Sequence, residues 1–559
     1  MKYCFPVLAC VTWLLLSAAA TFAGDLVVEL CSKSDPTDRI VGRLVEQTKG
    51  QWTVVSRGRR ITVYEGEFES CQSTIVDPED EQKRRDLREA QRRREAAEER
   101  KRQEIEETKR KAGLVVPPET EELIMEGSGT VSVGVLPTII EEYAHSIGAT
   151  VSASNTNELK QAIGPGHYEL TAGGSSKPFL RIVVKPGGSN SGFSALAAKS
   201  AHVGLSSRPY NNGETEKLLT LSGKKSREEI ERVLGLDAIV IIVHPSNRVR
   251  SLQLCEIARL FSGDSRTWQG AGGEARRVTP NVLTASSGTY ELFRSILREN
   301  CHVEISANAV PNTTWEDMIA SVARDPGSIG FAGLAVLSPR VKALGVKGAC
   351  GIENAASRFA VKTEDYPLTR RLFLYTPYPL QKESQRFLDY LPTADAQAAV
   401  GKTQAVDQTI EMAANPRRAS GPIQDVELQQ DAQSLGEYDR DLRGAERLSI
   451  SYRFKSNSTE LDTKANEDIV RLAAYFQNNP THRSLLIAGF TDAVGPPEAN
   501  RRLALGRAEI VRRALENVGA RLDVGSVQVN GYGEILPVAC NDTEVGREKN
   551  RRVELYLRK

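Results

Sequence analysis

An aspartate and an arginine near the C-terminus have the types and spacing of a site for a small group that carries both charges. Asp492 lies in the glycine-flanked turn of residues 489–495, directly after an apolar run that is predicted to be a strand. Arg507 lies on a helix predicted to begin after Pro496-Pro497, so the two side chains can converge. A carboxylate that accepts an ammonium group, beside a guanidinium that binds a carboxylate, suits a zwitterion. The alternative is that Asp492 caps the turn and Arg507 pairs with a surface carboxylate.

The helix around Arg507 is predicted from apolar residues that recur at spacings of three and four, which gives it one buried face. Gly519 is expected to end the helix. The predicted face consists of Leu503, Ala504, Ala508, Val511, Leu515 and Val518. A helix packed in this way against the preceding strand holds Arg507 near the turn that carries Asp492.

Short motifs in this region together resemble the OmpA-like peptidoglycan-binding domain, over residues 447–559. They are Gly-Phe-Thr-Asp at 489–492, Asn500, Leu503, Arg507, Gly-Tyr-Gly at 531–533, Pro537, Asn-Asp-Thr at 541–543, Gly-Arg at 546–547 and Asn-Arg-Arg-Val at 550–553, after Phe454 and Leu461. The resemblance implies an α/β sandwich that binds peptidoglycan. In that family the residues that match Asp492 and Arg507 hold the zwitterionic end of diaminopimelate in the stem peptide, and the residue that matches Asn500 assists.

Length and charge limit what the rest of the chain can be. A chain of 559 residues should contain more than one domain, because single cores stop growing at roughly 250 to 300 residues. Lys plus Arg number 73 and Asp plus Glu number 72, so the overall charge gives no indication of a nucleic-acid partner. Residues 1–23 have the pattern of a secretory signal peptide, which predicts an exported protein. Together with the OmpA-like resemblance, this implies a periplasmic location associated with the cell wall or outer membrane. A membrane anchor and a lipoprotein signal at Cys10 are the less favoured alternatives.

Six cysteines follow the signal peptide, and none has the spacing of a zinc site or a Cys-x-x-Cys redox pair, so no metal or other cofactor is expected. In an oxidising compartment the disulfide candidates are Cys31 with Cys71 and Cys301 with Cys350, the pairs that stay within one expected domain. Cys255 and Cys540 have no evident partner.

Two small segments precede the largest domain. Residues 25–75 alternate apolar and polar residues in four short runs separated by turn residues, which predicts a small antiparallel β module. Residues 77–112 are almost entirely charged, with acid and base pairs at i,i+4, which predicts a single solvated helix. A disordered charged linker is the alternative for this second segment.

Residues 124–413 alternate apolar strands with helical stretches, as in an α/β fold. Serine, threonine and glycine cluster in four loops, at 127–130, 187–192, 206–208 and 286–289, and three of these precede predicted helices. Free backbone N–H groups, hydroxyl donors and the positive end of a helix dipole together form an anion site. Ordinary N-capping is the alternative for any one of these loops.

The same loops resemble those of phosphate-type periplasmic substrate-binding proteins, the PstS-like class of ABC importers. The resemblance implies a type II binding-protein fold, with two α/β lobes that are joined by hinge strands and close over phosphate or a related oxyanion. The ligand residues carried over are Ser128, Thr130, Ser189, Ser191, Ser206, Arg208, Ser287, Gly288 and Thr289.

Two positions depart from that pattern. High-affinity phosphate binders of the family place an aspartate where this chain has Ser207, and an arginine where it has Leu283. Arg208 is the candidate to replace the missing cation. Without a carboxylate acceptor for the proton of hydrogen phosphate, discrimination between phosphate and sulfate should weaken.

Polar residues at 414–446 are predicted to form a linker between the two domains. The combined expectation is a periplasmic oxyanion-binding protein, served by an ABC permease and anchored non-covalently to peptidoglycan. The alternative is a structural envelope protein that uses the binding-protein fold as a spacer or a partner-binding surface. No enzymatic motif is present, so catalytic residues are not expected.

Overall fold

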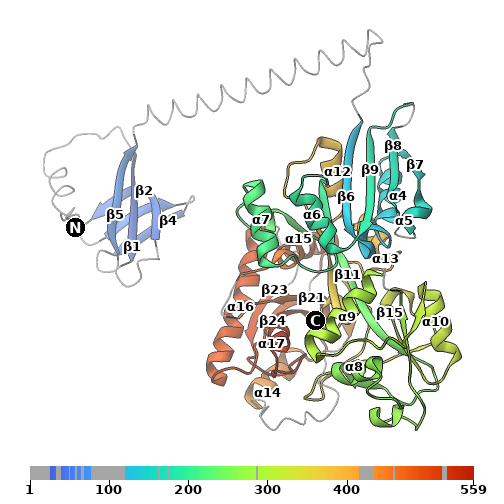
Figure 1. Ribbon diagram of the computed structural model, residues 1–559. Coiled ribbons are helices and arrows are strands. Elements are labelled where there is room, and N and C mark those ends of the chain that lie inside the picture. The colour runs from blue at the N-terminus through green and yellow to red at the C-terminus, as the bar shows by residue number, and fades with distance from the viewer. Residues whose placement is uncertain are drawn as a thin grey trace, which may run out of the picture. The chain divides into compact units, whose positions relative to one another are not determined.

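The computed structural model describes two compact units, Met1–Val116 and Pro117–Lys559 (Figure 1). In the first unit the described residues are 25–32, 39–48, 51–56, 59–64 and 68–76, and in the second they are 120–558 without 161–163, 173–174, 285–286, 415–431, 457–459, 482 and 519–525. The predicted signal peptide, the charged helix of 77–112 and the helix end at Gly519 lie outside the described residues.

The first unit contains an antiparallel sheet with the order β4-β3-β2-β1-β5. Its strands are β1 (Asp25–Ser32), β2 (Arg39–Thr48), β3 (Gln51–Ser56), β4 (Arg59–Tyr64) and β5 (Phe68–Val76). The first four follow the predicted runs. The strand β5 was not predicted, because its sequence has few apolar residues at alternate positions. The expected Cys31 to Cys71 bridge concerns side chains outside those that the structure describes.

Lobe 1 of the larger unit is built on a sheet in which β6 lies between β9 and β10, parallel to both. Its strands are β6 (Glu121–Ser128), β7 (Ala149–Ser154), β8 (Gly166–Ala172), β9 (Leu180–Gly187) and β10 (Val203–Ser206). Its helices are α3 (Gly129–Ser132), α4 (Leu136–Ser146), α5 (Thr156–Lys160), α6 (Ser189–Ala197), α7 (Asn212–Ser222), α12 (Lys382–Tyr390) and α13 (Ala394–Gly401). Apolar residues of β6, β9, α4 and α13 form its core.

Lobe 2 contains a second strand group and its own apolar core. Its strands are β12 (Ser251–Gln253), β13 (Thr279–Leu283), β14 (Val310–Asn312), β15 (Ser328–Gly333), β16 (Lys342–Ala343), β17 (Gly345–Lys347) and β18 (Glu353–Asn354). Its helices are α8 (Leu254–Ser262), α9 (Gly288–Cys301), α10 (Trp315–Arg324) and α11 (Arg358–Lys362).

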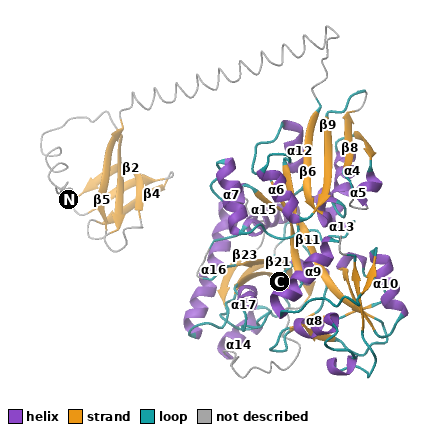
Figure 2. Cartoon of the chain, viewed as in Figure 1, coloured by secondary structure: helices purple, strands orange, loops and turns teal. Residues whose placement is uncertain are grey.

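Two antiparallel strands, β11 (Glu231–Val243) and β19 (Thr369–Tyr375), join the lobes. β11 pairs with β15 of lobe 2, and β19 pairs with β10 of lobe 1, so both lobes share one continuous sheet. Figure 2 shows helices distributed around these strands in both lobes. The predicted two-lobed α/β architecture with hinge strands is therefore present.

The C-terminal domain is an α/β domain, as the resemblance implied, and is built around a sheet ordered β20-β21-β24-β22-β23. Its strands are β20 (Met412–Ala414), β21 (Glu446–Arg453), β22 (Ser484–Gly489), β23 (Ser526–Gly531) and β24 (Arg552–Arg558), and its helices are α14 (Ala432–Asp441), α15 (Thr463–Asn478), α16 (Pro497–Asn517) and α17 (Glu544–Asn550). Ala504, Ala508, Val511 and Leu515 are buried as predicted, whereas Leu503 and Val518 are exposed. They lie at the margins of the buried stripe, where solvent reaches the side chain.

The predicted linker at 414–446 needs correction at both ends. β20 pairs with β21, so this strand near the end of the predicted binding domain belongs to the C-terminal sheet. Tyr438 of α14 and Leu442, the residue after the helix, pack in one apolar cluster with Tyr532 and with Tyr556 of β24. The polar sequence concealed this helix because few of its residues are apolar. Residues 415–431 lie outside the described residues.

The disulfide prediction for Cys301 and Cys350 is wrong. Cys301 bonds to Cys255 across α8 and α9, and Cys350 of lobe 2 bonds to Cys540 of the C-terminal domain. The prediction restricted each pair to one domain, and the second bond instead joins two domains. Among the helices that the structure describes, none is long and apolar enough to cross a membrane.

Candidate binding sites

Arg507 occupies the buried side of α16 and is 1% exposed. A Cβ at Gly489 of β22 would overlap the carbonyl of Ala504, so this glycine allows α16 to approach the sheet closely. The Arg507 guanidinium lies over the ring of Phe454, 5.5 Å from its centroid. Its Nε and Nη1 atoms are buried and have no hydrogen-bond partner. Two unsatisfied donors on a buried cation are the feature expected of a site that awaits an anion.

Asp492 lies near Arg507, but its carboxylate is already engaged by Arg551, whose Nη1 donates to Asp492 Oδ2 at 2.8 Å. The Val494 N–H also donates to Asp492 Oδ1. The pKa of Arg507 is lowered to about 10, mainly by burial and also by the nearby positive charge of Arg551, while Asp492 opposes both effects. The carboxylate and two guanidinium groups therefore form one electrostatic cluster.

Asn500 is buried on the first turns of α16 and donates from Nδ2 to Glu534 Oε2 at 2.5 Å. Asn541 Oδ1 accepts from the Ala493 N–H and from Asn550 Nδ2. These amide contacts hold the loop that carries Asp492. Arg551 and Asn541 received no role in the sequence analysis, although both lie within motifs that carried the resemblance.

The predicted loops of lobe 1 lie at one edge of the sheet. The register places Ser128 opposite Gly187 and Gly127 opposite Leu205, so the loops after β6, β9 and β10 are neighbours. Ser189 Oγ accepts from the Ser207 N–H at 3.2 Å, which joins two of these loops directly. Ser206 Oγ is turned inward and donates to the Arg208 carbonyl at 2.6 Å. Ser191 Oγ donates to the Gly188 carbonyl at 2.9 Å.

Arg208 does not supply a free cation. Its Nη1 and Nη2 donate to the two carboxylate oxygens of Glu214, each at 2.8 Å. Glu214 also accepts from the Asn211 N–H in the capping box of α7. The ion pair with Arg208 lowers the pKa of Glu214 although partial burial opposes it. The expectation that Arg208 replaces the missing cation is therefore not supported by its contacts.

The loop of lobe 2 carries the remaining candidates at the start of α9. Ser287 is the N-cap residue and its Oγ accepts from the Thr289 N–H at 3.3 Å. Gly288 is the first residue of the helix, and Thr289 is 7% exposed. Leu283 ends β13 inside the apolar core of lobe 2, so no cation is present at that position.

Arg370 of the hinge strand β19 connects the two sets of loops. Its Nη2 lies 3.2 Å from Thr130 Oγ1 of lobe 1 and 3.3 Å from Thr289 Oγ1 of lobe 2. The sequence analysis did not select Arg370. A charged residue that precedes the apolar run Leu372–Tyr375 could have indicated it, but nothing in the sequence shows that β19 passes between these threonines.

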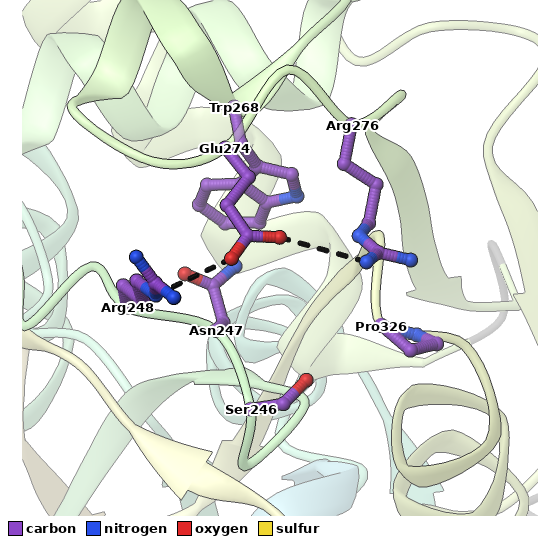
Figure 3. Close-up of a pocket in the computed structure, with 7 residues that line it drawn as sticks. All are labelled: Ser246, Asn247, Arg248, Trp268, Glu274, Arg276 and Pro326. Carbon is purple, nitrogen blue, oxygen red and sulfur yellow. Dashed lines mark ion pairs between the residues drawn. The ribbon is translucent and has the colours of Figure 1, made fainter.

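A hollow elsewhere in lobe 2 is lined by Ser246, Asn247, Arg248, Trp268, Glu274, Arg276 and Pro326. Figure 3 shows Glu274 between Arg248 and Arg276, with ion-pair distances of 3.3 and 3.6 Å. The hollow has room for about one water molecule, roughly 10 Å³. Its cations are paired and none of the predicted ligands lines it. Among the residues that the structure describes, no cluster of His, Cys, Asp or Glu side chains is arranged to hold a metal ion.

Comparison with known families agrees with this architecture. Residues 117–394 match the family model of the PBP superfamily domain, and residues 453–551 match that of the OmpA family. The chain therefore carries a substrate-binding-protein domain followed by an OmpA family domain. More particularly, the first of these domains is similar to PstS-like substrate-binding proteins, as the sequence motifs predicted.

Individual relatives are distant. Protein SphX of Synechococcus elongatus is 25% identical over 217 residues, which span 37% of this chain and 62% of SphX. The phosphate-binding protein PstS of Bacillus subtilis is 24% identical over 224 residues, which span 40% of this chain and 69% of that protein. Outer membrane porin F of Pseudomonas aeruginosa is 36% identical over 108 residues, which span 19% of this chain and 30% of the porin.

Among solved structures, an ABC-type phosphate transport receptor from Vibrio cholerae matches with a TM-score of 0.38 and 17% identity, over 50% of this chain and 98% of the receptor. The peptidoglycan-associated lipoprotein of Burkholderia pseudomallei matches with a TM-score of 0.18 and 31% identity, over 19% of this chain and 89% of the lipoprotein.

Proposed function

We propose that this protein is an exported receptor for a tetrahedral oxyanion of the phosphate type that binds non-covalently to peptidoglycan. The observation that carries the proposal is the buried Arg507 guanidinium with two unpartnered donors beside Asp492. In this proposal Arg507 donates to the carboxylate of a diaminopimelate end, and the Asp492 carboxylate accepts from the ammonium of that end as well as from Arg551. The location is the periplasm, against the cell wall.

The oxyanion site is proposed to lie between the lobes. The loops after β6, β9 and β10 are neighbours at one edge of the sheet, and Arg370 contacts Thr130 on the lobe 1 side and Thr289 at the start of α9. Neutral hydroxyl and backbone donors bind an anion without much formal charge. The proposed partner for delivery is the permease of an ABC importer.

Wall binding is tested by co-sedimentation of the purified full chain with diaminopimelate-type peptidoglycan. Arg507→Ala and Asp492→Ala should abolish sedimentation, because each leaves one end of the zwitterion unpaired. Arg512→Ala is the matched control, since Arg512 lies on the same helix in an ion pair with Glu509. Unchanged sedimentation of both site variants would exclude this site.

Anion binding is tested by isothermal titration calorimetry of the full chain with phosphate, sulfate and pyrophosphate. Heat with at least one of them supports a receptor. The absence of heat with all three favours the second candidate, a structural envelope protein. Two observations favour that candidate. Glu214 neutralises Arg208. In addition, the C-terminal domain contacts Arg371 and Glu231, which lie on the hinge strands.

A further inference from the structure

Arg370 is held at the junction of the lobes by a cross-strand ion pair. Asp237 of β11 lies directly opposite Arg370 of β19 in the antiparallel register. Asp237 Oδ2 accepts from Arg370 Nε at 2.8 Å and from Nη2 at 2.5 Å, and Oδ1 accepts from the Ala238 N–H at 2.7 Å. The orientation of the guanidinium is therefore fixed by the hinge itself.

One edge of this guanidinium has no partner. The Arg370 side chain is 8% exposed, and its Nη1 is buried without a hydrogen bond. A charged donor that is removed from water and left without a hydrogen-bond partner destabilises a fold, because its contacts with water are lost and not replaced. If the ion pair served only to join β11 and β19, the Nη1 donor would stay unsatisfied and no other interaction would compensate for it.

The surroundings of Arg370 are those of an anion site. Thr130 belongs to α3, which follows the Ser128 loop, and Thr289 belongs to the first turn of the 14-residue helix α9. Arg370 Nη2 contacts both hydroxyl oxygens. Arg208, the expected replacement for the missing cation, is neutralised by Glu214, and the position where the family places an arginine holds the apolar Leu283.

We propose that Arg370 is the cationic ligand of the oxyanion site and that its Nη1 donates to a small tetrahedral oxyanion held between Thr130 and Thr289. The assignment rests on the proposed receptor function and names the residue that gives the site its charge. Arg370 lies on a hinge strand and contacts a hydroxyl from each lobe. Anion binding and the contact between the lobes therefore depend on the same side chain.

The experiment compares phosphate and sulfate binding to the full chain by calorimetry. Arg370→Lys keeps the positive charge beside Asp237 but cannot serve the carboxylate and the anion through separate nitrogens. The loss of one charge-assisted hydrogen bond should weaken binding by at least about tenfold. Arg370→Gln combined with Asp237→Asn removes both charges together, so it avoids an unpaired buried carboxylate, and it should weaken binding at least as much.

Arg181→Gln is the control for a loss of positive charge, because Arg181 forms a half-exposed ion pair with Glu169 on β9 and β8. It should bind as the parent does. If the parent binds an anion and both Arg370 variants, folded by circular dichroism, bind it within about twofold of the parent, the role of Arg370 is overturned while the receptor function stands. If the parent binds none of phosphate, sulfate and pyrophosphate, the receptor function fails and this inference fails with it.

Discussion

The Arg507 guanidinium illustrates how a residue proposed to bind a ligand can oppose stability. Without ligand, burial and the neighbouring Arg551 lower the pKa of Arg507 to about 10, which means that its charged form is disfavoured in the folded protein. The unpartnered Nε and Nη1 atoms add the penalty of unsatisfied buried donors. The fold tolerates this penalty at a position where a ligand carboxylate would remove it.

Arg507→Met should therefore raise the free energy of unfolding of the ligand-free protein, by about 1–2 kcal/mol, while it abolishes peptidoglycan binding. Methionine keeps an apolar chain beside Phe454 and removes the buried charge. Urea denaturation at pH 7 measures the first effect, and co-sedimentation measures the second. A variant that is less stable than the parent would show that Arg507 serves mainly in packing.

Ser207 bears on which oxyanion the site prefers. It follows the buried Ser206, at the position where the resemblance places an aspartate that accepts a proton from hydrogen phosphate. Asp237, the nearest carboxylate to Arg370, already accepts hydrogen bonds on both oxygens. Neither residue therefore offers a free carboxylate that would weaken the binding of an anion without a proton, such as sulfate.

The parent should bind phosphate and sulfate with affinities within about tenfold of each other, and Ser207→Asp should shift the ratio toward phosphate by at least about tenfold. A carboxylate at this position accepts the phosphate proton and repels sulfate. Calorimetric dissociation constants for both anions at pH 7 give the ratio. A ratio unmoved by Ser207→Asp would mean that residue 207 does not face the anion.

At the scale of elements, the first turns of α15 lie on the hinge strands of the binding-protein domain. Asp462, the N-cap residue, pairs with Arg371 of β19 at 2.6 Å. Thr463 Oγ1 donates to Glu231 Oε1 at 2.9 Å, and Glu467 Oε1 accepts from the Val233 N–H at 3.2 Å. One helix of the OmpA family domain thus contacts both strands that connect the lobes.

Glu467 makes this contact pH-dependent. The pKa of Glu467 is raised to about 7, mainly by burial and also by the charge of Asp468, while Arg471, the Val233 N–H and Arg232 oppose the rise. The folded state therefore holds a proton that the unfolded chain releases near pH 4.5, and stability falls as pH rises from about 4.5 to about 7.

Glu467→Gln should raise the unfolding free energy at pH 8 by on the order of 2 kcal/mol and change it little at pH 4.5. Glutamine retains an oxygen for the Val233 N–H and has no charge to bury. Thermal unfolding of parent and variant at pH 4.5, 6 and 8 gives the comparison. An equal shift at all three values would assign the effect to packing instead of ionisation.

Sequence alone predicted well those elements whose apolar residues are buried within their own domain, because the spacing of these residues then shows which face is buried. Ala504, Ala508, Val511 and Leu515 located the buried face of α16, and the serine and threonine loops located the edge of lobe 1. Tyr438 on α14 escaped prediction because the apolar residues of that helix are few. Arg370, Asp237 and Arg551 escaped because their significance depends on which strands and loops become neighbours, which local sequence does not encode.

At the scale of the whole molecule, the disulfide between Cys350 and Cys540 cross-links lobe 2 of the binding-protein domain to the C-terminal domain. Both cysteines are buried beside Ile352. A Cβ at Gly348 would overlap Cys540 Sγ, so glycine is needed where the two segments meet. Cys540 precedes Asn541, whose side chain holds the loop of Asp492. Lobe 2 is thereby joined to the segment that supports the proposed wall site.

Cys350→Ser with Cys540→Ser should lower the unfolding free energy by about 3–5 kcal/mol, because the bond closes a loop across a sequence separation of 190 residues. Urea denaturation of the oxidised parent and the double variant measures this change. Cys255→Ser with Cys301→Ser is the comparison, since it opens a loop of only 46 residues inside lobe 2 and should destabilise less. Equal stabilities of the parent and the Cys350/Cys540 variant would contradict the expectation.

Buried charges join the same two domains without a covalent bond. Asp365 of lobe 2 accepts from Arg447 at 2.8 Å and from Arg453 at 2.7 Å, and all three side chains are at most 10% exposed. The burial of Asp365 tends to raise its pKa, but Arg447 and Arg453 hold the pKa well below its usual range. The carboxylate therefore stays charged between two guanidinium groups at neutral pH.

Asp365→Asn should lower the unfolding free energy by about 3 kcal/mol or more, because it leaves two buried guanidinium groups without their counter-charge. Glu383→Gln is the control, since its ion pair with Arg386 is solvent-exposed on the arginine side and should contribute less than about 1 kcal/mol. In the background of Cys350→Ser and Cys540→Ser, Asp365→Asn should also separate the single unfolding transition of the larger unit into two. A single transition in that triple variant would show that the contacts of α15 with the hinge strands suffice to couple the domains.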